Sequence, residues 1–188
     1  SDTKAAALPV ADIKDRDYIR KLFLDQGLSV TALNNYLRCP WQYFFINLIR
    51  IPKSEGNSQL YGTAVHETLK EFFDSYRKEE DIPKAKMLSL FEAHLSRKHL
   101  RSEDFKELKE RGLEALAGYH DFYNKKWPRQ IMNEFKVNGV FLPVSYNGGK
   151  TDLLLKGNLD KIEILAGRDI NVVDYKTGKP KTRNQILG

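Results

Sequence analysis

The chain has 188 residues, of which 41% are hydrophobic and 30% charged, and this is typical of a globular protein with one domain and some appendages. Its single cysteine, Cys39, excludes an internal disulfide and a multi-cysteine metal site within the chain, which fits a reducing cytoplasm. The net charge of +6 permits binding to a polyanion without demanding it, because a solvated surface with a small excess of lysine has the same charge. No apolar run approaches the length that spans a membrane, so we expect a soluble cytoplasmic protein.

The N-terminal part predicts an arm and two short helices. Residues 1–14 look like the arm, and a helix is expected over 15–24. Ser29 or Thr31 can cap a second helix that runs to Leu37.

An aromatic run follows Pro40. We interpret it as core or as packing between helices, and a surface that stacks on nucleic-acid bases is the less favoured alternative. The run consists of Trp41, Tyr43, Phe44 and Phe45. Residues 52–60 then predict a loop.

Three longer helices are predicted after this loop. The first is expected from Gly62 or Thr63 to about residue 78, the second over 83–100 and the third over roughly 103–126. In the first and third, apolar side chains recur at helical spacing, which indicates one buried face on each.

The pattern changes to strands after Trp127-Pro128. Strands are expected over 135–146, 153–165 and 170–176, separated by turn signals. The fold class is therefore α+β, with a large helical portion followed by a mostly antiparallel sheet. We divide the chain into an arm with a short helix, 1–28, and a main domain, 29–188, whose helical part is 29–130 and whose sheet core is 131–188.

The last predicted strand ends in an acid and a base. Side chains alternate between the two faces of a strand, so Asp174 and Lys176 should point the same way and Tyr175 the other. Asp160 lies on the preceding strand, and the short turn at 166–169 makes these strands antiparallel neighbours. We therefore expect the carboxylates of Asp160 and Asp174 to lie side by side.

Two neighbouring carboxylates repel each other, and a divalent cation removes that repulsion. Oxygen ligands suit Mg²⁺ or Mn²⁺, which can activate a water and hold a phosphate oxygen. Lys176 could orient that water and stabilise the developing charge, so the pattern favours a phosphodiesterase site. The alternative is structural: a cross-strand ion pair between Asp160 and Lys176, with Asp174 as a turn or edge residue.

Five segments of the sequence form a set of motifs that covers most of residues 29–180. They are SVTALNNYLRCPWQYFF (29–45), GTAVHETLKEFF (62–73), NEFKVNGVF (133–141), GNLDKIE (157–163) and VVDYKTGKP (172–180). In content and order this set resembles the RecB-type branch of the PD-(D/E)xK nuclease superfamily, as found at the C-terminus of superfamily 1 helicases and in AddB-like and CRISPR-associated exonucleases.

This resemblance implies a restriction-endonuclease-like core and a role for each matching residue. Asp160 and Asp174 would be metal ligands, His66 would be a further ligand from its helix, and the backbone carbonyl of Tyr175 would complete part of the metal shell. Lys176 would be the catalytic lysine. Glu134 would be the acid on or before the first strand, which assists a metal or holds a helix. For His66 taken alone, a hydrogen-bonded core or capping histidine remains the alternative.

The resemblance also implies a function. It predicts a Mg²⁺- or Mn²⁺-dependent DNA nuclease, an exonuclease of DNA repair or recombination, with a helicase domain in the same parent chain or on a partner subunit. The alternatives are a catalytically inactive DNA-binding module and a domain that docks a helicase through residues 41–45.

Two features of the resembled family concern the C-terminus. The family continues with a helix that carries a Gln-x-x-x-Tyr pair, whereas here only three residues follow Gln185, so we expect a C-terminally truncated core. Some members carry an iron–sulfur cluster on four cysteines. Cys39 occupies the place of the first, and a cluster would require the others to lie beyond Gly188; the alternative for Cys39 is a small buried side chain.

Overall fold

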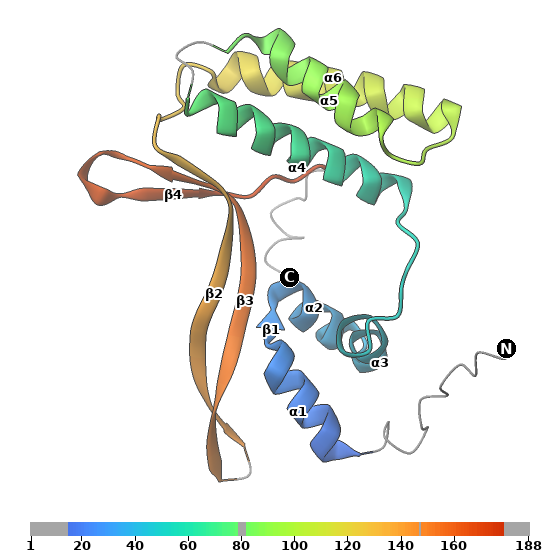
Figure 1. The fold of residues 1–188 in the computed structure, drawn as a ribbon, viewed down its shortest axis with the longest axis vertical. Helices are drawn as coiled ribbons and strands as arrows, with labels where there is room; N and C mark the ends of the chain where they lie inside the picture. The colour runs from blue at the N-terminus through green and yellow to red at the C-terminus, as the bar shows by residue number, and fades with distance from the viewer. Residues whose placement is uncertain (1–14, 79–81, 147, 179–188) are drawn as a thin grey trace, which may run out of the picture. The chain divides into compact units, whose positions relative to one another are not determined.

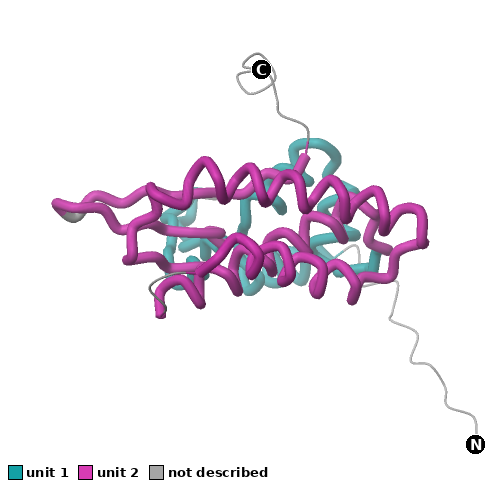
Figure 2. Tube along the Cα trace, turned by 90° about the horizontal axis from the view of Figure 1, so that it is seen from above, with its two compact units in different colours: residues 1–53, 136–157 teal, residues 54–135, 158–188 magenta. Residues whose placement is uncertain are grey.

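The computed structural model describes residues 15–78, 82–146 and 148–178. The arm predicted for residues 1–14 lies outside these residues, and so does Gln185. The chain forms two compact units, shown in Figure 2: unit 1 contains residues 1–53 and 136–157, and unit 2 contains residues 54–135 and 158–188. The predicted division at residue 28 stays a prediction.

The described residues form an α+β fold, as predicted (Figure 1). None of the helices in this part of the chain is long and apolar enough to cross a membrane. The α-helices are α1 (Arg16–Gln26), α2 (Val30–Arg38), α3 (Pro40–Tyr43), α4 (Asn57–Tyr76), α5 (Lys84–Ser96) and α6 (Ser102–Tyr123). The strands are β1 (Leu28–Ser29), β2 (Ile131–Tyr146), β3 (Gly149–Ile164) and β4 (Ile170–Val173).

In unit 1, α1 and α2 begin at caps that the sequence provides. The Asp15 side chain accepts hydrogen bonds from the first turn of α1, and Ser29 accepts one from Ala32 N in α2. Gly27 ends α1 at a φ of 69°, and a Cβ there would lie 2.6 Å from the Leu154 carbonyl oxygen. Only glycine fits this turn. The turn leads into β1, which pairs in parallel with β3 through Leu28 and Leu155.

The aromatic run divides between core and surface. Tyr43 is buried with Ala32 and Leu48, which confirms the packing interpretation for that residue. Trp41 remains 67% exposed and stacks on the half-exposed Phe45, with ring centroids 6.1 Å apart. After α3 the chain continues as one turn of π-helix, Phe44–Leu48.

In unit 2, helices α4, α5 and α6 form the main core. Helix α5 packs against both α4 and α6. Phe72 and Phe73 of α4 and Phe91 of α5 are fully buried, and Trp127 packs against the rings of Phe72 and Phe73. Helix α6 comes close to α5 at Gly112, where a Cβ would lie 2.0 Å from the Phe91 ring.

Helix α4 begins earlier than predicted. Residues 57–60, expected in a loop, form its first turn, because Gly56 adopts an extended conformation and its carbonyl accepts from Gln59 N and Leu60 N. The early start places His66 in the middle of a long helix.

The sheet also differs from the prediction in two details. It has four strands in the described chain, because the two-residue β1 was not predicted. Strand β4 pairs antiparallel with β3, as expected, but ends at Val173 rather than Lys176. The last pair in the register is Lys161 with Val173, so Asp174 and Lys176 follow the strand instead of belonging to it.

Candidate metal centre

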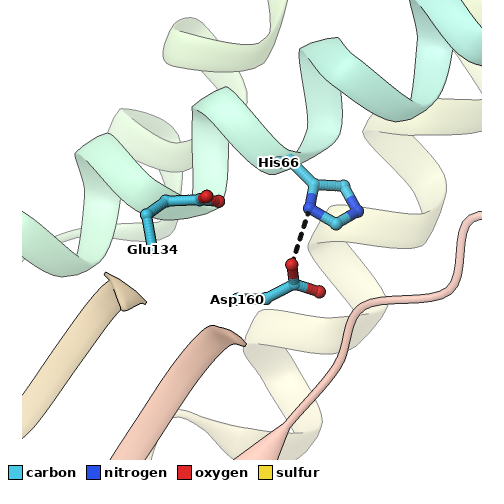
Figure 3. A group of neighbouring side chains, drawn as sticks. All are labelled: His66, Glu134 and Asp160. Carbon is cyan, nitrogen blue, oxygen red and sulfur yellow. Dashed lines mark ion pairs between the residues drawn. The ribbon is translucent and has the colours of Figure 1, made fainter. Parts of the chain in front are cut away.

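Three of the predicted site residues meet in unit 2. His66 comes from α4, Glu134 from β2 and Asp160 from β3, and one potential ligand atom of each lies within 4.8 Å of the others (Figure 3). All three side chains are half-buried. One imidazole nitrogen and two carboxylate oxygens at this spacing can bind a divalent cation.

Helix α4 presents His66 on a polar stripe beside its apolar face. Gly62, His66 and Lys70 recur at a spacing of four and share one face, whereas Val65 and Leu69 are buried in the core. Thr177 passes next to Gly62, where a Cβ would lie 3.2 Å from the Thr177 hydroxyl oxygen. The glycine therefore lets the segment after β4 approach α4 closely, one turn before His66.

Glu134 reaches the site through an unusual backbone conformation. Its φ is +49°, a region that residues other than glycine rarely adopt and that costs free energy. Consecutive side chains of a strand normally point to opposite faces, but here two consecutive side chains both meet α4. Asn133 donates to Asp74 of α4 at 3.0 Å, and Glu134 lies in the group with His66 of α4. Asn158 of β3 donates a hydrogen bond to the Glu134 carboxylate. Such strain is found most often at functional sites.

Tyr175 connects the site residues through its backbone. Its N–H donates to Asp160 Oδ2 at 2.6 Å, and its carbonyl lies 3.2 Å from His66 Nε2. His66 Nδ1 lies 3.4 Å from Asp160 Oδ1. A single ring proton on Nδ1 would be donated to the Asp160 carboxylate, which leaves the Nε2 lone pair beside the Tyr175 carbonyl oxygen. That tautomer offers a ring nitrogen and a carbonyl oxygen, 3.2 Å apart, to one cation.

The Tyr175 side chain anchors this backbone segment in the core. Burial and the neighbouring Tyr119 raise the pKa of the Tyr175 hydroxyl, and burial raises the pKa of Tyr119 to about 12. Both phenols are therefore neutral at physiological pH. Tyr119 also accepts a hydrogen bond from Lys161 Nζ at 3.3 Å.

Lys161 itself is buried, with 1% of its side chain exposed. Its ammonium group lies 2.6 Å from Glu163 Oε1 and 4.2 Å from the centre of the Phe73 ring. Burial lowers the pKa of Lys161, while Glu163 acts in the opposite direction. Asn171 of β4 donates to Glu163 at 2.7 Å, so the buried pair ties β4 to β3 just before Tyr175.

Asp174 and Lys176 are not part of the three-residue group. Their side chains are 59% and 81% exposed, and Lys176 Nζ lies 2.6 Å from Asp174 Oδ2. The two side chains thus meet each other, in keeping with the predicted common direction, while the Tyr175 side chain is packed against the core. One further step of the β3–β4 register would place Asp174 opposite Asp160. The predicted alternative, an ion pair between Asp160 and Lys176, differs from the pair that the structure forms.

Several residues at the site had no signal in the sequence. Arg111 of α6 donates to the Thr177 carbonyl at 2.8 Å and holds the segment after β4 from a position 66 residues away. Asn158 and Asn133, which fix Glu134 and its neighbour, lie inside the segments GNLDKIE and NEFKVNGVF, so those motifs pointed to the right place without indicating a role.

The part of the chain that contains these site residues is similar to known proteins. The model of the PD-(D/E)XK nuclease superfamily matches residues 27–186. The chain is 25% identical over 204 residues to an ATP-dependent helicase/deoxyribonuclease subunit from Clostridium tetani (strain Massachusetts / E88), an alignment that covers 90% of this chain. The chain spans only 17% of the length of that relative. No solved structure matches the chain.

Proposed function

The chain belongs to the PD-(D/E)XK nuclease superfamily, as its motifs predict, and from this membership we propose that it is a divalent-metal-dependent DNA nuclease. The observation that supports this proposal most strongly is the convergence of His66, Glu134 and Asp160 from three separate elements. A purely structural histidine would not require a strained acidic residue beside it.

The donor set fits Mg²⁺ or Mn²⁺. Two half-buried carboxylates near each other repel, and a divalent cation relieves that repulsion. We assign His66, Asp160 and the Tyr175 carbonyl as ligands, with Glu134 as a further ligand or as the residue that orients them. A bound ion at this position would polarise a phosphate oxygen and lower the pKa of a water.

Asp174 and Lys176 complete the proposed site. The register supports a place for Asp174 opposite Asp160, and the exposure of both side chains leaves them free to change rotamer. If Asp174 turns toward the cation, its ion pair with Lys176 opens and the ammonium group becomes available. Lys176 would then hold the attacking water and offset the negative charge that develops on the phosphorus oxygens.

The substrate and the cellular role are also proposals. The relative from Clostridium tetani is named as part of a helicase/deoxyribonuclease, which supports DNA as the substrate and a helicase in the parent protein or its complex. We propose exonucleolytic cleavage in DNA repair or recombination, in the cytoplasm.

A cleavage assay tests this function. End-labelled DNA, single-stranded and duplex, is incubated with the chain and with the longest available parent protein in Mg²⁺ or Mn²⁺. We expect cleavage that EDTA abolishes and that falls by at least about a hundredfold in Asp160→Asn, because one interaction that stabilises the transition state contributes roughly 3 kcal/mol. The control is Asp121→Asn, which removes an exposed aspartate paired with Lys84 at 2.8 Å.

The inactive DNA-binding module remains the competing function. It predicts that the parent protein binds DNA but cleaves neither substrate with either ion, and that Asp160→Asn leaves every activity unchanged. Metal-independent binding together with absent cleavage would therefore reject the nuclease.

A further inference from the structure

Unit 1 contains a cavity with cationic walls. Its volume is about 320 Å³, and Asn47, Arg50 and Lys156 lie among the residues that line it. None of the lining residues is acidic. In the part of the chain that the structure describes, neither Arg50 nor Lys156 forms an ion pair. Two cations that share a cavity without a carboxylate repel each other, and an anion would offset that repulsion.

The described residues of unit 1 carry a positive net charge, as the cavity does. Unit 1 has nine lysines and arginines among its described residues, but only four aspartates and no glutamate. The described residues of unit 2 are almost balanced, with 17 cations and 16 acids. The excess positive charge of the described chain is therefore concentrated in the unit that holds this cavity, and it attracts a polyanion.

The cavity also contains a directed hydrogen-bond donor. Asn35 Nδ2 donates to Asn47 Oδ1 at 2.9 Å, which occupies the carbonyl end of the Asn47 amide. The NH₂ end of Asn47 thus remains to donate to a ligand. With Arg50 and Lys156, it makes a set of donors that suits the oxygens of a phosphate.

Two costly backbone conformations form the wall of this cavity. Ile46 and Asn47 belong to the π-helical turn, Phe44–Leu48, and Arg50 has a φ of +60°. Both conformations are uncommon, and both recur at functional sites. The positive φ of Arg50 also ends the helical segment, because it lets Ile51 N donate to the Phe45 carbonyl oxygen at 2.9 Å. The same turn places the Arg50 side chain at the cavity.

Strand pairing supplies the second cation. The parallel register of β1 and β3 sets Ser29 opposite Lys156, so a lysine distant in sequence is fixed next to the start of α2. We propose that Asn47, Arg50 and Lys156 bind a phosphate group of the DNA, at a place separate from the metal centre. Only the identity of the polyanion rests on the proposed function.

Equilibrium binding without catalysis tests this site. Fluorescence anisotropy of labelled oligonucleotides is measured in EDTA over a series of salt concentrations. We expect Arg50→Gly combined with Lys156→Gln to weaken binding by about tenfold or more, because hydrogen bonds between charged groups are the strong ones. For each phosphate that the double variant no longer binds, the slope of log K against log salt should become shallower by about 0.7 on single strands and about 0.9 on duplex.

The variants are chosen to separate binding from folding. Glycine adopts a φ of +60° without strain, so Arg50→Gly removes the guanidinium group and should leave the protein at least as stable. Lys136→Gln combined with Lys150→Gln is the charge-matched control, since both lysines are exposed in the same unit but do not line the cavity. Oligonucleotides with and without a terminal phosphate distinguish a phosphate monoester from a backbone diester.

Wild-type affinity and slope in the cavity double variant would overturn the proposal, as would an equal loss of affinity in the control that combines Lys136→Gln with Lys150→Gln. The nuclease proposal is read separately, from cleavage by Asp160→Asn. If the cavity variants weaken DNA binding but the parent protein never cleaves, the phosphate site stands and the nuclease fails. If cleavage depends on Asp160 but the cavity variants bind DNA normally, the nuclease proposal stands and the phosphate site fails.

Discussion

Removing the buried ammonium group of Lys161 should destabilise unit 2 strongly. Lys161→Met keeps a long apolar stem but leaves Glu163 with only its hydrogen bond from Asn171. Lys161 is 1% exposed and the Glu163 side chain 11% exposed, so solvent can do little to compensate. Breaking such a pair costs about 3–5 kcal/mol, whereas replacing both partners with uncharged groups is often nearly neutral.

The measurement is urea denaturation followed by circular dichroism for the wild type, Lys161→Met, Glu163→Gln and the double variant. We expect Lys161→Met to lose about 3–5 kcal/mol of unfolding free energy and the double variant to regain most of that loss. At this chain length, the single variant should also unfold roughly 6–20 °C lower. A loss below about 1 kcal/mol in Lys161→Met, with no coupling to Glu163, would refute the buried pair as the link between β3 and β4.

Three further predictions concern the core, the phenols and the site. Gly112→Ala should destabilise the protein by about 1–3 kcal/mol, because the new Cβ would lie 2.0 Å from the buried Phe91 ring. Gly118→Ala in the same helix meets nothing within 4 Å and should stabilise the protein by about 0.5–1 kcal/mol. Thermal unfolding of the two variants checks this contrast, and equal effects would contradict the packing at Gly112. Burial raises the pKa of Tyr119 from 10.0 to about 12, so the unfolded chain loses this proton first. The free energy of unfolding should therefore fall as pH rises from 10 to 12, by about 2 kcal/mol more in the wild type than in Tyr119→Phe, and parallel pH profiles would argue against it. Asp174→Asn should lower cleavage by at least about tenfold while Asp121→Asn, of equal exposure, leaves it unchanged, and indistinguishable rates would remove Asp174 from the site.

Much of this arrangement could be predicted because it depends on local patterns. The spacing of Val65, Leu69 and Phe72 indicates a buried helix face, and the same helix necessarily places His66 beside that face. The short turn after β3 makes β3 and β4 antiparallel, which brings Asp160 to the end of β4. The α+β class follows from the same change of periodicity after Trp127.

Other features depend on contacts between segments that are distant in the sequence, and no local sequence pattern indicates such contacts. Val172-Val173 predicts a strand that continues to Lys176, but ladder pairing stops at Val173 and the Tyr175 N–H bonds to the Asp160 side chain instead. The positive φ of Glu134 has no residue-type signal, since glutamate rarely adopts it. Strand β1 has only two residues, which is too short to show the alternation of apolar and polar residues that indicates a strand.

The nuclease proposal depends on one divalent cation bound by His66 and Asp160, with Glu134 beside it. The most direct measurement is a crystal of the chain grown with Mn²⁺, with anomalous diffraction recorded to locate the ion. The account predicts a peak in coordination contact with His66 and Asp160, which Asp160→Asn abolishes. A peak elsewhere, or an ion held by Asp174 without either of these two side chains, would contradict it.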